Sequence, residues 1–322
     1  MNTAKKVLLV VAIASILAGM MLCFGGFAAM GFAFTELNSM THETHTYTIE
    51  EPFTNLFIDG AECDIRLLPS ETGDCRVVCR ESVKIDHTVR VVDGTLTIER
   101  VDHRKWYERF ASFHWGKMEV AVYLPESAYA SLSVSGVSGN VEIPADFSFT
   151  NAQVQCTSGD VRFLASVENK LSIKTVSGNL SVRDLAPKSL YVQTTSGDVT
   201  IASVRTEAEL EVKTVSGDIG FSQVECGSVN AETTSGDVGA SALCVSGSMR
   251  IKTVSGDVDL RGCDADTLWI KTTSGDVSGR LLTEKSFLTD TTSGRVRVPP
   301  SQSGGRCEVT TVSGDISFTI EG

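Results

Sequence analysis

The residues of this sequence with the clearest potential for chemistry are aspartates that recur at a fixed distance along the chain. Most follow the glycine of a Ser-Gly-Asp phrase, and that glycine recurs at spacings of 19 or 20 residues. The ten copies are Gly139, Gly159, Gly178, Gly197, Gly217, Gly236, Gly256, Gly275, Gly294 and Gly314. If the repeats stack, the carboxylates form a column, and several oxygen ligands of this kind could hold Ca²⁺.

A structural role for the phrase is the alternative, because Ser and Asp brace tight turns and Gly supplies permissive backbone angles. Three exceptions favour it: Asn140 and Asn179 keep hydrogen bonding without charge, and Arg295 reverses the charge. The sequence therefore predicts no metal site and no cofactor. We assign turn roles to the phrase, represented by two neighbouring copies: Ser216, Gly217, Asp218, Ser235, Gly236 and Asp237.

Catalytic arrangements are not evident in the repeats. Ser-Gly-Asp is not the strained GxSxG elbow of a hydrolase, and the Gly-rich stretches lack the lysine of a phosphate loop. No Cys-x-x-Cys pair has the spacing of a zinc site. The five histidines all lie outside the repeats: His42, His45, His87, His103 and His114. We predict that the protein is not an enzyme, with a solenoid glycan hydrolase as the remote alternative.

Eight of the nine cysteines lie beyond the apolar N-terminal segment. Cys156, Cys263 and Cys307 occupy apolar positions of the repeat, where a free Cys is commonly buried. Cys63 and Cys79 could instead face each other across a hairpin and form a disulfide outside the cell. Core packing is the expected use of most of these residues, and the disulfide is left open.

The segment 102–117, DHRKWYERFASFHWGK, is the most distinctive non-repeating stretch, because aromatic and cationic side chains gather in it. Such side chains suit a lipid headgroup interface or a protein partner. The alternative is a cap, since the open end of a stacked-repeat protein must be covered. The candidate binding residues are Arg104, Trp106, Tyr107, Arg109, Phe110, Phe113 and Trp115.

Alternation of apolar and polar residues around each turn predicts the elements that position these groups. Leu210 and Thr214 precede Gly217 by seven and three residues, so the two-residue period of a strand places both on one face, with Lys213 on the other. A unit of about 19 residues cannot bury its own apolar face, but stacked copies can share one core. We therefore predict an all-β fold, a parallel β-solenoid of 19–20-residue repeats.

The number of repeats in each coil stays open at this stage. The residue two before the glycine alternates between Val and Thr, which fits either a double-repeat coil or pairwise duplication. Double-repeat coils would stack Lys174, Lys213 and Lys252 on one another, and like charges directly opposite are destabilising. One repeat per coil is therefore favoured.

The charge and the N-terminal segment indicate the location of the chain. A net charge of −12 argues against nucleic acid as a partner, because phosphate binding needs basic surface. Residues 7–34 carry no charge and follow MNTAKK, which predicts a transmembrane helix with a cytoplasmic N-terminus and an extracytoplasmic body. Cleavage near Ala28–Gly31 is the alternative. We expect an anchor at 1–35, a β-rich cap with the first coils at 36–130, and regular repeats at 131–322.

The repeated T-[VT]-S-G-[DN]-[VIL] phrase, the N-terminal anchor and YTIEEPFTNLFIDGAECDIRLLPSETGDCRVVCRE together resemble a bacterial family labelled "putative adhesin". The resemblance covers roughly residues 45–322 and implies a surface-attached β-solenoid of the cell envelope, a domain of unknown function. Some members are similar to accessory proteins of envelope-stress and antimicrobial-peptide responses. The implied function is a membrane-anchored module that binds an envelope protein, lipid or glycan. A surface adhesin or structural scaffold is the alternative.

Overall fold

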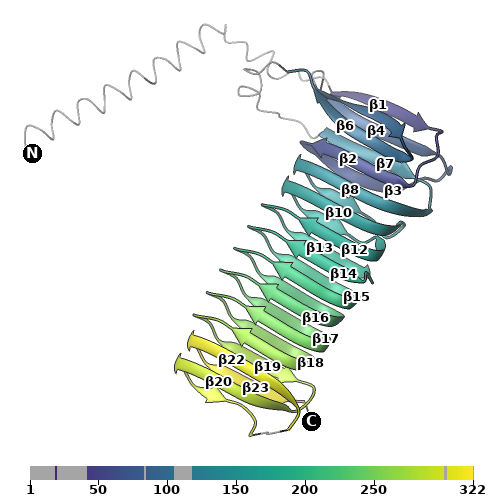
Figure 1. Ribbon diagram of the computed structural model, residues 1–322. Coiled ribbons are helices and arrows are strands. Elements are labelled where there is room, and N and C mark those ends of the chain that lie inside the picture. Colours follow the sequence, from purple (N-terminus) through teal and green to yellow (C-terminus); the bar gives the residue numbers. More distant parts are fainter. Residues whose placement is uncertain (1–18, 20–41, 83–84, 105–117, 301–302, 322) are drawn as a thin grey trace, which may run out of the picture. The chain divides into compact units, whose positions relative to one another are not determined.

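Stacked parallel strands make up almost the whole fold of the described chain (Figure 1). The computed structural model describes Gly19 and residues 42–82, 85–104, 118–300 and 303–321. The predicted all-β parallel solenoid is confirmed. Within those ranges no helix has the length and apolar character needed to cross a membrane. Apart from Gly19, the predicted anchor at 1–35 lies outside the described residues.

The strands form three groups along the chain. The first group builds the N-terminal end: β1 (His42–Ile49), β2 (Asn55–Ala61), β3 (Cys63–Pro69), β4 (Cys75–Ser82), β5 (Ile85–Val92), β6 (Thr95–Asp102) and β7 (Met118–Leu124). The regular coils follow: β8 (Ala128–Ser138), β9 (Val141–Ile143), β10 (Ser148–Ser158), β11 (Val161–Phe163), β12 (Ser166–Lys174), β13 (Leu180–Leu185), β14 (Ser189–Gln193), β15 (Val199–Lys213), β16 (Ile219–Glu232), β17 (Val238–Lys252), β18 (Val258–Lys271) and β19 (Val277–Leu281). The last group is β20 (Lys285–Ser293), β21 (Val296–Arg297), β22 (Gly305–Ser313) and β23 (Ile316–Ile320).

Each coil contains one repeat. Leu210 in β15 pairs with Leu190 in β14 on one side and with Val229 in β16 on the other. Lys213 accordingly lies between Gln193 and Glu232, so that unlike side chains neighbour it in the stack. This register is the one favoured by the argument from charge repulsion.

The core is a continuous apolar column inside the coils. Leu210 and Val212 are fully buried, and Thr214 is 5% exposed. Cys156, Cys263 and Cys307 are buried free thiols, as their positions in the repeat predicted. The inward parity of the strands therefore follows the apolar pattern of the sequence.

Truncating Leu210 to alanine is expected to cost about 2–5 kcal/mol of stability, because it leaves a cavity in this column. Lys213→Ala should cost well under about 1 kcal/mol, since the lysine is partly exposed and its ion pair with Glu211 lies at the surface. Urea unfolding of both variants measures the difference. Equal losses would contradict the inward and outward assignment of the two side chains.

The corner of each coil is held by a hydrogen-bond ladder that runs through the aspartates. The Asp237 N–H donates to Asp218 Oδ1 at 2.8 Å, and the Asp257 N–H donates to Asp237 Oδ1 at 2.7 Å. The same bond links the stack in the order Asp64, Asn140, Asp160, Asn179, Asp198, Asp218, Asp237, Asp257, Asp276, Asp315 and Arg295. Each carboxylate or amide oxygen thus satisfies a backbone donor of the next coil, and asparagine serves as well as aspartate.

Arg295 stands where the ladder ends. Its N–H donates to Asp315 Oδ1 at 2.8 Å, but among the described residues no further coil donates to its side chain. Its guanidinium instead bonds Asp315 Oδ2 at 2.8 Å. These bonds hold the pKa of Asp315 below its ordinary value, the backbone bond being the larger cause. The reversed charge in the column is explained by this terminal position.

Glycine and threonine at the corner allow the coils to approach closely. A Cβ atom on Gly236 would lie 2.0 Å from the carbonyl oxygen of Gly217 in the preceding coil. That same oxygen accepts a hydrogen bond from Thr233 Oγ1 at 3.2 Å. The buried threonines therefore bind the stacked glycine carbonyls, and the turn phrase acts as a contact between coils.

The last two coils stack in the reverse of their chain order. β18 and β19 pair with β22 and β23, and these pair in turn with β20 and β21 (Figure 1). The isolated bridge of Ser274 accordingly joins Ser313 rather than Ser293. The final segment of the chain therefore lies between two earlier ones, with partners on both sides.

A similar exchange occurs at the N-terminal end. The coil of β2 and β3 lies between that of β6 and β7 and that of β8 and β9. Beyond β6 and β7 the pairing becomes antiparallel, with β4 beside β7 and β5 beside β6. We call β1 to β7 the cap. Its antiparallel strands cover the parallel edge of the solenoid.

Candidate functional site

The predicted aromatic and cationic patch lies mostly outside the described residues. Of its members only Arg104 is described; the others are Trp106, Tyr107, Arg109, Phe110, Phe113 and Trp115. Arg104 lies two residues beyond the end of β6 and has a side chain only 7% exposed. Whether the remaining residues bind a partner stays a prediction.

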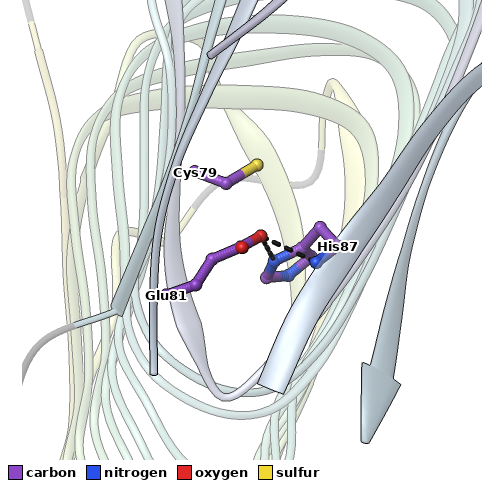
Figure 2. A group of neighbouring side chains, drawn as sticks. All are labelled: Cys79, Glu81 and His87. Carbon is purple, nitrogen blue, oxygen red and sulfur yellow. Dashed lines mark hydrogen bonds and ion pairs between the residues drawn. The ribbon is translucent and has the colours of Figure 1, made fainter. Parts of the chain in front are cut away.

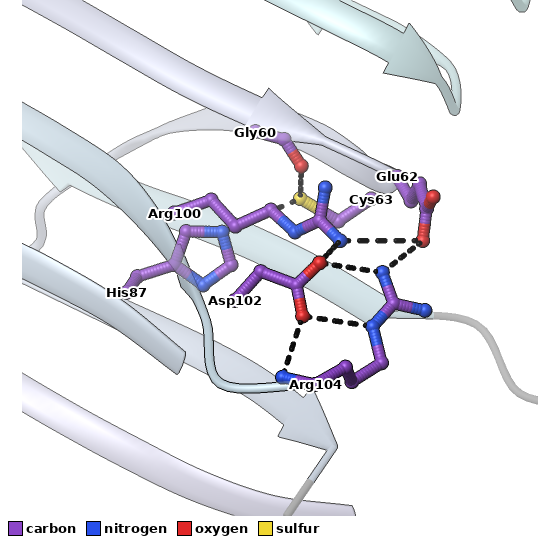
Figure 3. Close-up of polar contacts among 7 residues, drawn as sticks. All are labelled: Gly60, Glu62, Cys63, His87, Arg100, Asp102 and Arg104. Atoms are coloured by element: carbon purple, nitrogen blue, oxygen red, sulfur yellow. Dashed lines mark hydrogen bonds and ion pairs between the residues drawn. The ribbon is translucent and has the colours of Figure 1, made fainter. Parts of the chain in front are cut away.

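Arg104 belongs to a compact ion-pair network in the cap (Figure 3). Its Nε and Nη2 donate to the two carboxylate oxygens of Asp102 at 2.8 and 2.9 Å, and its backbone N–H donates to the same group. Arg100 approaches Asp102 at 3.2 Å, and Glu62 lies 3.7 Å from Arg100. The side-chain bond from Arg104 is the main reason why the pKa of Asp102 lies well below its ordinary value. Among the described residues Arg104 therefore serves to hold the end of β6 through Asp102.

A second polar group, formed by Cys79, Glu81 and His87, lies buried in the cap (Figure 2). Cys79 and Glu81 are two residues apart on β4, so strand alternation directs both inward, and His87 comes from β5. Glu81 Oε1 accepts hydrogen bonds from the His87 backbone N–H at 2.7 Å and lies 2.8 Å from its Nδ1. The side chains of His87 and Glu81 are 1% and 2% exposed.

Cys63, the first residue of β3, lies on the other side of the His87 ring. Its Sγ is 3.8 Å from His87 Nε2 and donates to the Gly60 carbonyl at 2.6 Å (Figure 3). Burial raises the pKa of the Cys63 thiol to about 12, against a lowering effect of Arg100. Burial, followed by the charge of Glu81, also raises the pKa of Cys79. Both cysteines are free thiols, and both belong to one cluster with Glu81 and His87, which we call the cap cluster.

The order thiol, imidazole, carboxylate is that of a nucleophilic triad. Two observations argue against this use of Cys63. A catalytic cysteine is usually exposed and has a lowered pKa, whereas this thiol is 3% exposed with a raised pKa. Moreover, none of Cys63, Cys79, Glu81 and His87 lines any of three open pockets on the described surface. The cap cluster is therefore better suited to a structural role inside the cap than to nucleophilic catalysis.

An open pocket of about 540 Å³ lies elsewhere on the cap, between the end of β1, the β3–β4 turn and the β7–β8 turn. Its rim carries the exposed carboxylates of Glu50, Glu51 and Asp74. The rings of Phe53 and Tyr129 stack in it with centroids 6.0 Å apart. We call this the cap pocket. Tyr129 is 4% exposed, so only the half-buried ring of Phe53 offers aromatic surface, and no basic residue is among those that line the pocket.

Sequence reasoning missed both features. A meeting of Cys63 and Cys79 across a hairpin was left open, with core packing preferred, and both are free thiols. Their grouping with Glu81 and His87 was not predicted, because β5 has no repeat against which its parity could be read. The Cys-x-Glu spacing on an alternating strand was the available signal. The cap pocket is lined by three segments that are about 25 and 50 residues apart in the chain, so no local sequence pattern predicts it.

Comparisons with known proteins identify the family. The family model for the Toastrack DUF4097 domain matches residues 53–244 and 205–322. A solved "putative adhesin" from Parabacteroides distasonis is 14% identical, with a TM-score of 0.47 over 87% of this chain and 98% of its own. Another, from Bacteroides fragilis, is 16% identical, with a TM-score of 0.42 over 87% and 98%. No curated protein matches the sequence. The chain belongs to the Toastrack DUF4097 family.

Proposed function

We propose that this protein is a membrane-anchored, extracytoplasmic binding module of the bacterial cell envelope that acts without catalysis in envelope-stress sensing. The cap pocket is the observation that carries the proposal. Its size is within the range of ligand sites, about 300–1,000 Å³. Its three rim carboxylates and the half-buried ring of Phe53 suit a cationic, amphipathic peptide, since the ring can contact an apolar side chain and the carboxylates attract Lys and Arg.

The anchor in this proposal rests on the sequence. Residues 7–34 are uncharged and long enough to span a bilayer, and the lysines before them favour a cytoplasmic N-terminus. The end of β1, the first strand, contributes Thr48 and Ile49 to the cap pocket. A solved "putative lipid binding protein" from Parabacteroides distasonis, 12% identical with a TM-score of 0.38 over 88% of this chain and 98% of its own, is a further structural neighbour.

The test is binding of an amphipathic Lys-rich peptide, measured by calorimetry at low and high salt. The Glu50→Gln, Asp74→Asn variant is expected to lose about tenfold or more in affinity, which corresponds to about 1.4 kcal/mol, and salt should weaken binding by the parent. A matched control is Glu209→Gln, Glu225→Gln, which removes two exposed carboxylates from the solenoid. Equal affinity for parent and pocket variant, or the same loss in the control, would overturn the proposal.

A further inference from the structure

We propose that the open end of the solenoid pairs with the same end of a second copy of this chain, with β20 of one copy antiparallel to β20 of the other. β20 and β21 lie at the end of the stack away from the cap (Figure 1). Among the described residues β20 pairs only with β22, and β21 only with β23. The inference concerns the assembly of the chain and does not depend on the cap pocket or its ligand.

The last coil exposes apolar side chains at positions that the neighbouring coils bury. Val296 is 43% exposed, whereas Ile316 and Val277, which follow their turn glycines by the same two residues, are fully buried. Phe287 is half-buried, although its neighbour in the stack, Cys307, is fully buried. The exposed end of a stacked-repeat core needs a cover. A second open end offers a matching surface, because its apolar side chains lie at the same positions of the coil.

The backbone of the last coil presents groups that bond to a further coil elsewhere in the stack. The Ile316 N–H donates to the Arg295 carbonyl at 2.9 Å, and Val296 holds the position of Ile316 in the last coil. The Thr273 carbonyl accepts a bond of 3.0 Å from the coil that follows it in the stack, and Thr292 holds the position of Thr273. Among the described residues no coil follows the last one. Its edge therefore offers both donors and acceptors, as pairing with its own copy requires.

The cap favours a second copy as the occupant of this edge. Antiparallel strands already end the parallel stack there, with β4 beside β7 and β5 beside β6. A two-fold axis across the open end sets the strands of a second copy antiparallel in the same way. Because the cap covers the other end of each solenoid, an open end cannot stack on a cap end. Assembly accordingly stops at two copies.

The length of β20 fixes the expected register. Pairing over all nine residues puts Thr289, the middle residue, opposite its own copy. Leu288 then lies opposite Asp290 of the second copy and diagonal to Leu288 of that copy, which is within reach of long side chains. Leu288 is 56% exposed, the highest value among large apolar side chains of the described residues. Pro299 and Pro300, after β21, have no N–H to donate, so β20 is the strand that offers a continuous edge.

The experiment uses the full chain in a density-matched detergent under reducing conditions. Sedimentation equilibrium of the parent is expected to show monomer and dimer, with the dimer favoured as the protein concentration rises. Leu288→Asp sets carboxylates opposite Asp290 and diagonal to each other, so it should weaken dimerisation about tenfold or more. Leu288→Lys sets an ammonium group opposite Asp290 instead and should weaken it less. Equal losses in the two variants would overturn the antiparallel register.

Val176→Asp is the matched control, because Val176 is 49% exposed in the turn between β12 and β13, in the middle of the stack. It should dimerise like the parent. Hydrogen exchange locates the contact without any variant, since peptides from β20 should gain protection as the parent is concentrated. The proposal is overturned if the parent stays monomeric or forms larger species, if Leu288→Asp dimerises as tightly as the parent, or if Val176→Asp loses as much. Protection of β20 that does not change with concentration would also overturn it.

Discussion

Gly236→Ala is expected to lower the free energy of unfolding by about 3 kcal/mol or more, a large effect for the addition of one methyl group. The new Cβ would lie 2.0 Å from the Gly217 carbonyl oxygen and 2.6 Å from its carbon. Both are backbone atoms, so no side-chain rotation relieves the contact. Relief requires the two coils to separate at the corner, where Thr233 and Asp237 bond to the preceding coil.

The matched control is Gly239→Ala, three residues further along the same coil. A Cβ there meets no atom within 4 Å, so the change should stay within about 0.5 kcal/mol. Urea unfolding followed by circular dichroism compares the two variants. Similar stabilities for both would show that close stacking of the corner glycines does not hold the coils together.

Deleting residues 303–322 is expected to unfold β20 and β21 as well, although both precede the deletion in the chain. Among the described residues β20 pairs only with β22, and β21 only with β23. The deletion also removes the buried side chains of Val309, Ile316 and Phe318. At about 1.5–3 kcal/mol each, their loss removes roughly 5–9 kcal/mol of apolar stabilisation.

Hydrogen exchange followed by mass spectrometry measures this outcome. Peptides from 285–297 should lose protection in the shortened chain, whereas peptides from β16, in the middle of the stack, should keep theirs. Contacts in a stacked-repeat protein extend only to neighbouring coils, which is why the effect should stay local. Retained protection at 285–297 would mean that this coil stacks on β18 and β19, in chain order.

The repeating part of the fold could be predicted because the same short-range sequence pattern recurs in every coil. Apolar alternation around Gly217 gave the inward face that includes Leu210 and Thr214, and charge repulsion among lysines favoured one repeat per coil. The turn phrase was assigned a structural role, and the ladder from Asp218 to Asp237 shows its form. The aspartate side chains were expected to bond within their own turn. Each instead accepts a hydrogen bond from the backbone N–H of the next coil.

The ends of the solenoid could not be predicted in the same way. Chain order is the default order of stacking, and the local pattern of β22 is the same whichever coil lies beside it. In the cap, Cys63 and His87 are 24 residues apart with no repeat to relate them. Their meeting depends on antiparallel pairing of β5 with β6, which is a long-range property. Both the coil exchange and the cap cluster therefore required the structure.

The exchanged coils change the meaning of the alternation between valine and threonine before each turn. Along the chain the pattern breaks, because Thr273 is followed by Thr292 and then by Val312. In the stack Val312 lies between the other two, since its N–H bonds to Thr273 and its own strand, β22, pairs with β20. The order in space is then unbroken: Val137, Thr157, Val176, Thr195, Val215, Thr234, Val254, Thr273, Val312 and Thr292.

Pairwise duplication alone would have left the alternation in chain order, so spatial neighbours account for it better. The valines of this column are 39–51% exposed, and an uninterrupted row of them would form an apolar stripe along the surface. Threonine between every two valines breaks that stripe. In this protein the residue two before the corner glycine therefore alternates between coils that are neighbours in the stack. The interruption of the alternation along the chain marks the two coils that are stacked in the reverse of their chain order.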